Sequence, residues 1–180
     1  NIAVRHYDNK DDVRHKFLAH YYKGCVHYNA KDYTKAILSF SKAELLQEDL
    51  HDDYYSGLLF QNLGYLYFRY YDYPKSLSYH KQAIDCYTKS NKQTHRLYEL
   101  LKLANIYETG TPTIPANPEE ATRLRQLAVE LAMTSQDLLK HIDLKAAKKA
   151  IESMPKLDLQ SAVEKQILAE KGKEPYDFYI

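Results

Sequence analysis

The chain has 180 residues, of which 25 are basic and 24 are acidic, and its formal net charge is +1. This length predicts one domain with a sizeable core, and the balanced charge argues against a nucleic-acid or anionic-membrane surface, which needs a clustered basic excess. The sequence has no run of 18 apolar residues, so we expect no membrane-spanning segment.

Tyrosine is unusually frequent, with 18 copies and no tryptophan. Tyrosine combines a large apolar ring with a polar hydroxyl, which suits both half-buried packing positions and interfaces. The two cysteines, Cys25 and Cys86, form no disulfide framework and no C-x-x-C motif. We expect both to be free thiols buried within helices.

The chain begins with residues 1–7, which read as the end of a helix from an earlier repeat. The Asp- and Asn-containing segment 8–11 is then expected to be a turn. Helices are predicted over about 12–29 and 33–49, separated by a short turn. Gly24 lies inside the first of them, where Gly costs roughly 1 kcal/mol relative to Ala, so a close approach of another helix is expected there.

Similar pairs of helices follow along the chain. The predicted ranges are 51–70 with 73–90, and 92–109 with a helix that restarts near Pro118 after a Pro-rich loop. Beyond Met133 the pattern dissolves, and two atypical helices within 134–172 are expected to cap the array. The tail 173–180 is expected to be extended.

A 40-residue period relates these pairs to one another. The positions that recur at this spacing are Gly24, Gly64 and Ala104; Ala3, Ala43 and Ala83; Tyr33 and Tyr73; and Lys35 and Lys75. A period of this length without strand signals predicts stacked helix pairs. The expected organisation is therefore a partial repeat over 1–8, pairs over about 12–49, 51–90 and 92–133, and the C-terminal helices.

Each copy also carries a similar set of side chains. They are Gly24, His27, Tyr33, Ala36, Phe40 and Ala43; Leu63, Gly64, Tyr67, Tyr73, Ser76, His80 and Ala83; and Leu103, Ala104, Tyr107, Ala121 and Ala128. This pattern resembles the tetratricopeptide repeat over residues 1–133. The departures are Lys23, Ser76, His80 and the long 110–118 loop. The resemblance implies an all-α, right-handed α-solenoid of antiparallel helix pairs, and the atypical C-terminal helices would form its cap.

Members of this family usually act as protein- or peptide-binding scaffolds, with a concave surface lined by the first helix of each pair. The resemblance implies such a groove here, with an aromatic lining. Its candidate binding residues are Tyr21, Tyr28, Asn29, Gln61, Asn62, Tyr65, Phe68, Arg69, Tyr98, Lys102 and Asn105. Asn62 and Asn105 are expected to hydrogen-bond a ligand backbone. The alternative is that some of the aromatic residues pack within the chain itself.

Two other functions remain open. The tyrosine-rich style of the repeats resembles bacterial proteins in which such repeats precede a membrane anchor or a regulatory domain. That resemblance implies a region that senses a ligand or partner in the bacterial cytoplasm or periplasm. Self-assembly through incomplete repeat ends, giving a homo-oligomer, is the third possibility.

Motifs for catalysis were sought along the whole chain. His20 and His27 share a helical face but are seven residues apart, which is too far for adjacent metal ligands, and with His80 they occupy packing positions. No H-E-x-x-H, G-x-S-x-G or phosphate-binding glycine motif is present. The sequence therefore predicts a protein that is not an enzyme and has no cofactor or metal site, and whose partner is a protein or peptide segment.

Overall fold

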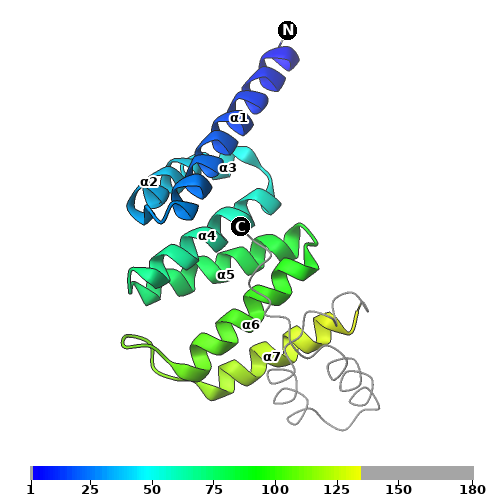
Figure 1. The fold of residues 1–180 in the computed structure, drawn as a ribbon. Helices are drawn as coiled ribbons and strands as arrows, with labels where there is room; N and C mark the ends of the chain where they lie inside the picture. Colours follow the sequence, from blue (N-terminus) through cyan, green and yellow to red (C-terminus); the bar gives the residue numbers. More distant parts are fainter. Residues whose placement is uncertain (1, 135–180) are drawn as a thin grey trace. The chain divides into compact units, whose positions relative to one another are not determined.

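The computed structural model describes residues 2–134, which are helical apart from turns and one isolated bridge between Thr111 and Ile114 (Figure 1). The helices are α1 (Ile2–Asn29), α2 (Tyr33–Glu44), α3 (Gln47–Leu50), α4 (Asp53–Arg69), α5 (Tyr73–Lys89), α6 (Gln93–Thr109) and α7 (Pro118–Ala132). The all-α prediction is confirmed over this range. The predicted capping helices after residue 134 and the tail 173–180 lie outside the described residues.

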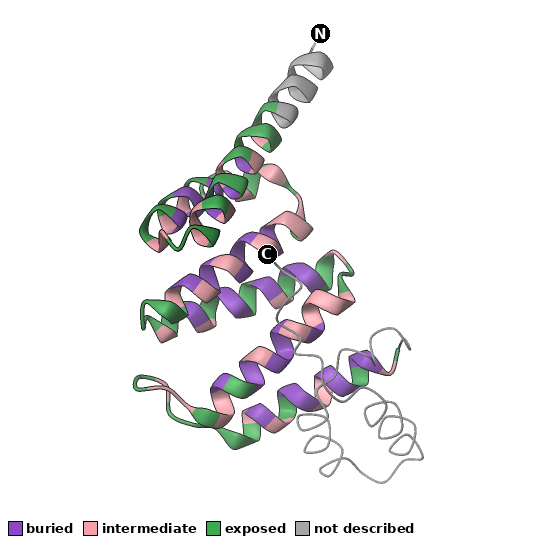
Figure 2. Ribbon diagram, in the orientation of Figure 1, coloured by how far each residue is buried: buried purple, intermediate pink, exposed green. Residues whose placement is uncertain are grey.

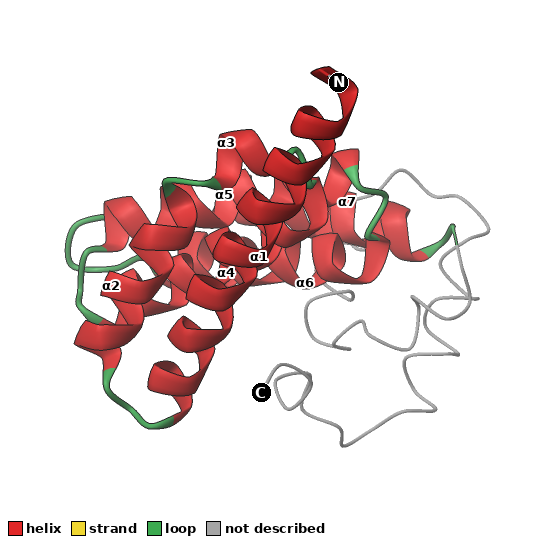
Figure 3. Cartoon of the chain, turned by 90° about the horizontal axis from the view of Figure 1, so that it is seen from above, coloured by secondary structure: helices red, strands yellow, loops and turns green. Residues whose placement is uncertain are grey.

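The chain divides into two compact units, with the boundary between Ser90 and Asn91. In the first unit α1 packs against α2 and α4 against α5, while α2 also contacts α4 and α1 contacts α3. In the second unit α6 packs against α7. A short loop joins α1 to α2 and α4 to α5, so the two helices of each pair run antiparallel (Figure 3).

Helices α4 to α6 begin and end within two residues of the predicted bounds, and α7 begins at Pro118 as expected. Aspartate or asparagine caps the N-termini of α4, α5 and α7, and proline follows in the first turn of α5 and α7. These are the residue types that begin helices most readily. Local chemistry therefore accounts for the accuracy of these bounds.

Two predictions in the first unit are wrong. The turn expected over 8–11 is absent, because α1 runs without a break from Ile2 to Asn29; that segment has no Gly or Pro, and Asp and Asn only mildly disfavour a helix. The second helix ends at Glu44 rather than near residue 49. The chain then turns so that Leu46 and Leu50, at the two ends of α3, pack against the core.

The first unit has a core of aromatic and aliphatic side chains. Figure 2 shows the buried positions along its helices. Phe40, which is fully buried, lies directly against Gly24, so that a side chain at position 24 would overlap its ring. His80, also fully buried, occupies the equivalent place against Gly64, where a Cβ would lie 2.8 Å from its ring. The close helix approach expected at Gly24, and the packing position expected for His80, are both confirmed.

The two cysteines differ in their surroundings. Both are free thiols, but Cys86 is buried whereas Cys25 is only half-buried. Burial raises the pKa of Cys86 to about 11, so this side chain is a neutral thiol near neutral pH. The prediction of a buried free thiol is confirmed for Cys86 and is correct only in part for Cys25.

The turns of the chain share a conformation that recurs every 20 residues. The residues with a left-handed backbone are Lys31, His51, Tyr71 and Asn91, with φ angles of 60°, 51°, 62° and 53°. In the first three turns the next residue is Asp32, Asp52 or Asp72, and its carboxylate accepts a backbone N–H of the following helix. In the fourth turn this position is Lys92, which makes no side-chain cap.

Replacing Lys92 with Asp is expected to stabilise the second unit. An aspartate at a helix N-cap is typically worth about 1 kcal/mol relative to alanine, and its negative charge favours the helix dipole. The measurement is urea unfolding of the 180-residue chain with Lys92→Asp and Lys92→Ala side by side. Equal stability of the two variants would contradict the assignment of this residue to the N-cap.

Candidate functional site

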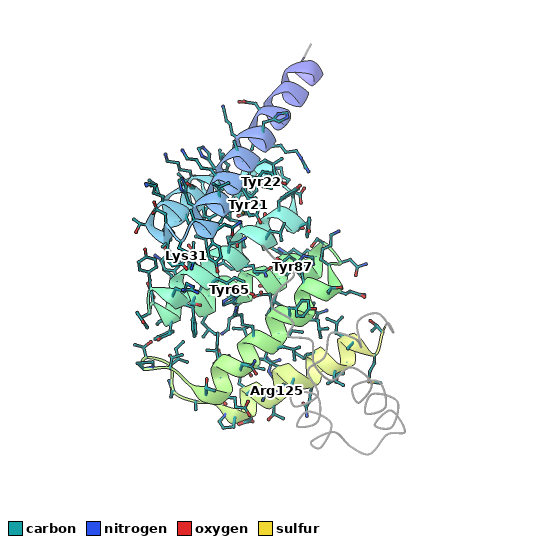
Figure 4. All side chains as sticks on the ribbon, viewed as in Figure 1. Tyr21, Tyr22, Lys31, Tyr65, Tyr87 and Arg125 are labelled. Carbon is teal, nitrogen blue, oxygen red and sulfur yellow. The ribbon has the colours of Figure 1, made fainter. Side chains whose placement is uncertain are left out.

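Two of the eleven candidate residues, Tyr21 (labelled in Figure 4) and Gln61, lie in the interior of the first unit rather than on a binding surface. Tyr21 is 7% exposed, and its ring contacts Phe17 and Phe40 at centroid distances of 6.2 and 5.8 Å. Gln61 is 4% exposed, and its side-chain oxygen accepts the hydroxyl of Tyr87. The prediction that packing leaves these two side chains available to a ligand is wrong, because both contribute to the core.

The two asparagines proposed to bind a ligand backbone already have partners within the chain. The side-chain amide of Asn62 donates to the carbonyl of Leu58 at 2.8 Å and to the hydroxyl of Tyr21 at 3.2 Å. The side-chain oxygen of Asn105 accepts from Arg125 at 3.1 Å. Asn62 therefore keeps only its acceptor for a ligand, and Asn105 keeps its donors.

Aromatic side chains gather where α1 meets α2 and α4 meets α5, and we call this region the turn surface. Its members are Tyr28, Tyr33, Phe68, Arg69, Tyr70, Tyr71 and Tyr73. Three of them are well exposed: Phe68 at 39%, Tyr70 at 46% and Tyr71 at 75%. Exposed aromatic rings that lie together on one surface are typical of an interaction site.

Direct contacts hold this surface together. The ring of Tyr73 lies edge-on to Phe68 at 5.2 Å and to Tyr71 at 6.1 Å. The guanidinium of Arg69 lies 4.9 Å from the centre of the Tyr33 ring, which contacts Tyr28 at 5.7 Å.

A hydrogen bond of 2.9 Å joins the hydroxyls of Thr34 and Tyr70. It links the first turn of α2 to the turn between α4 and α5. These contacts therefore join the two turns into one surface.

Tyr71 is the most exposed ring and also has an unfavourable backbone conformation. Its φ of 62° is the left-handed region, which costs a residue other than glycine on the order of 1–3 kcal/mol. Burial cannot repay that cost, since 75% of the residue is exposed. The same conformation recurs at Lys31, His51 and Asn91, so it belongs to the turn itself, and the exposed ring of Tyr71 adds apolar area to the turn surface.

Sequence reasoning found Tyr28, Phe68 and Arg69 but missed the other members of the turn surface. The residues missed are Tyr33, Tyr70, Tyr71 and Tyr73. Candidates were taken from one face of a helix, which passes over residues in the turns between helices. The signal was present in the sequence as aromatic residues at positions 68, 70, 71 and 73 around an aspartate.

The remaining candidates of the first unit lie near this surface or beside the core. Tyr65 is half-buried, with its ring edge-on to His80 at 5.4 Å, whereas Asn29 is exposed at the end of α1. The structure thus brings Tyr28, Phe68 and Arg69 together on the turn surface, and it separates them from the buried Tyr21 and Gln61.

Three candidates, Tyr98, Lys102 and Asn105, belong to the second unit and share one face of α6. Tyr98 is half-buried, and loss of contact with water raises the pKa of its hydroxyl. The same effect lowers the pKa of Lys102 to about 7. At the end of this face the buried guanidinium of Arg125 pairs with Glu108 and donates to Asn105.

The lowered pKa of Lys102 predicts a pH-dependent stability. Below about pH 7 the folded and unfolded chains are both charged at this position, so folding includes the cost of removing the ammonium from water. Between about pH 7 and pH 10 the unfolded chain holds a proton that the folded chain has released, so stability rises with pH by at most about 1.4 kcal/mol per unit. Lys102→Met should therefore unfold at higher urea than the wild type at pH 7, with the difference shrinking towards pH 10. A difference that is constant over this range would contradict the lowered pKa.

The described residues contain no cluster of three or more His, Cys, Asp or Glu side chains suited to a metal ion. Within the same part of the chain, no helix is long and apolar enough to cross a bilayer. No known protein family, curated protein or solved structure matches this chain.

Proposed function

We propose that this protein is a non-catalytic scaffold that binds a peptide or protein segment through the turn surface. The observation that carries the proposal is the exposure of Phe68, Tyr70 and Tyr71, of which Phe68 and Tyr71 both contact the ring of Tyr73. Rigid aromatic side chains bury a large area on binding and lose little conformational entropy, so they dominate many interfaces. Sensing and self-assembly are the other functions that the sequence suggests.

The scaffold would be a right-handed α-solenoid of tetratricopeptide-like helix pairs. Support comes from the 40-residue period and from the contact of α2 with α4, which stacks the first pair on the second within one unit. The equivalent packing of Gly24 on Phe40 and of Gly64 on His80 also fits a repeated structural module.

The proposed binding site differs from the concave groove implied by the resemblance. Of the groove residues in the first unit, Tyr21 and Gln61 are satisfied inside the core, and Asn62 has used both of its donors. Tyr28, Phe68 and Arg69 remain at the surface, and all three belong to the end of the helices where the turns lie. The site therefore moves from the middle of the helices to their ends.

Replacing Phe68 with Ala is expected to weaken binding at least tenfold. The experiment selects peptides from a random displayed library on the wild-type 180-residue chain and then measures their affinity by calorimetry for the wild type and for Phe68→Ala. A loss of this size corresponds to about 1.4 kcal/mol, which is typical for truncating an aromatic residue at the centre of an interface.

Leu45→Ala is the matched control, because Leu45 is an apolar side chain of the same unit that is 83% exposed and lies outside the turn surface. Its replacement should leave affinity unchanged. Equal affinity of the selected peptides for the wild type and Phe68→Ala would remove the turn surface from the proposed function.

A further inference from the structure

We propose that the partner of the turn surface is an acidic peptide segment, in which an apolar or aromatic anchor is flanked by Asp or Glu residues. This inference rests on the proposed function and adds the chemistry of the ligand. It follows from the charges around the rings, which are not balanced. Cations at this end of the unit are Lys31, Lys35, Arg69 and Lys75, whereas the turns contribute only Asp32 and Asp72 as acids.

Both acids are already engaged by the fold. The carboxylate of Asp32 accepts the backbone N–H of Lys35 at 3.2 Å and pairs with its ammonium at 2.7 Å. The carboxylate of Asp72 accepts the backbone N–H of Lys75 at 3.2 Å. Each helps to begin a helix, and Asp32 also neutralises Lys35. Asp72 keeps its negative charge, so the four cations exceed the two carboxylates of the turns by two.

Two of the cations are left for a ligand. Neither Lys31 nor Arg69 forms an ion pair with any acid of the described chain, and both residues are exposed. Lys31 lies at the left-handed position of the α1–α2 turn, two residues before Tyr33, and is labelled in Figure 4. A carboxylate placed near either group would gain an attraction that is strengthened by the apolar rings around it.

Arg69 is well prepared for such a ligand. Its guanidinium lies over the Tyr33 ring at 4.9 Å, a cation–π contact that restricts the side chain. The planar group offers two parallel donors, which match the two oxygens of a carboxylate. Because Tyr33 already restricts this side chain, less entropy is lost when a ligand binds.

The aromatic members of the turn surface provide for the anchor. Phe68 and Tyr71 each expose a ring beside Tyr73, and Arg69 directly follows Phe68 in the chain. An apolar side chain packed on these rings would bring the residues next to it within reach of Arg69 and Lys31. The surface therefore suits alternation of apolar and acidic residues in one short segment.

A single-stranded nucleic acid is also anionic and can stack on aromatic rings. The surface suits it less well, because binding of that kind needs a continuous basic groove along the backbone. Here Lys35 is paired with Asp32 and Lys75 is bonded to Tyr67. Only Lys31 and Arg69, which lies over the Tyr33 ring, are left to contact phosphates. The observations favour the peptide, and nucleic acid becomes an outcome of the test.

The test compares two fluorescein-labelled peptides of equal length, one alternating Phe with Glu and the other alternating Phe with Lys. Fluorescence anisotropy with the 180-residue chain at low salt is expected to show at least tenfold tighter binding of the Glu peptide. The preference should weaken at about 0.15 M ionic strength, because salt screens exposed charges. The double variant Lys31→Glu with Arg69→Glu should reverse the preference, whereas Lys42→Glu, at an exposed position on α2, should not change it.

Several results would overturn the inference. One is equal binding of the two peptides, and another is a change in preference with Lys42→Glu as large as with the double variant. Tighter binding of an oligothymidine than of the Glu peptide would point to nucleic acid. A wild-type dimer that Phe68→Ala dissociates would point to self-association. If the Glu peptide fails while library-selected peptides still lose affinity with Phe68→Ala, the ligand chemistry is wrong and the proposed function stands. If Phe68→Ala affects neither kind of peptide, both proposals fall. Because the two wild-type peptide measurements need no variant, a folding defect in the double variant does not affect them.

Discussion

Replacing Phe40 with Ala is expected to destabilise the first unit by about 3–5 kcal/mol, the usual cost of truncating a buried phenylalanine. Phe40 is 0% exposed, contacts Tyr21 and fills the space beside Gly24. Urea unfolding followed by circular dichroism measures the loss. Leu38→Ala is the control on the same helix, and because Leu38 is 58% exposed its replacement should cost far less.

The same contact predicts that the effect of Gly24→Ala changes sign with its partner. In the wild type the added methyl group overlaps the Phe40 ring, so the variant should lose about 1–3 kcal/mol despite the better helix propensity of alanine. In the Phe40→Ala background the ring is gone, and the methyl group should then stabilise by roughly 1 kcal/mol. Additive effects of the two substitutions would show that the glycine is not retained for this contact.

The second large effect concerns the buried arginine of the second unit. Arg125 is 3% exposed, pairs with Glu108, and has two buried nitrogens, Nε and Nη1, without a hydrogen-bond partner in the described chain. An arginine cannot lose its charge on burial. Glu108→Gln is therefore expected to cost about 3 kcal/mol, because it leaves an uncompensated charge in the interior.

Two variants separate this explanation from a general loss of packing. Glu130→Gln changes an exposed glutamate on α7 and should have little effect on the free energy of unfolding. Arg125→Met removes the buried charge, so adding Glu108→Gln to it should cost much less than Glu108→Gln alone. Equal costs in the two backgrounds would show that Glu108 does not act through Arg125.

The sequence predicted the elements whose signals are local. Pro74 and Pro118 in the first turn of their helices, and the capping Asp72 and Asn117 before them, are readable without a structure, and α5 and α7 begin where expected. The spacing of Gly24 and Gly64 also predicted close approach of a second helix, and their contacts with Phe40 and His80 agree.

Two parts of the fold depend on packing that no local signal contains. Residues 8–11 read as a turn from their composition but continue a helix, since nothing in them prevents it. The end of α2 at Glu44 depends on where Leu46 finds the core, which is a tertiary property.

The candidate site was less predictable than the fold for a related reason. Helical spacing shows which side chains share a face, but the hydrogen bond from Asn62 on α4 to Tyr21 on α1 forms only when these helices pack. Conversely, Tyr70 and Tyr71 stand in a turn, where helical spacing has no meaning. Their exposure depends on the left-handed backbone of Tyr71, which sequence does not indicate for tyrosine.

The 20-residue spacing of the left-handed turns means that the chain has two repeat lengths, one for its turns and one for its packing contacts. Turns recur every 20 residues, but the side chains that pack, such as Gly24 with Gly64, recur every 40. Loss or duplication of 40 residues would preserve both repeat lengths, so each remaining first helix would still pack against a second helix. A change of 20 residues would keep every turn in place yet exchange the roles of first and second helices, so Gly24 and Gly64 would lose the partners they now pack against. A chain of this kind is free to change length by whole pairs and is constrained against change by single helices.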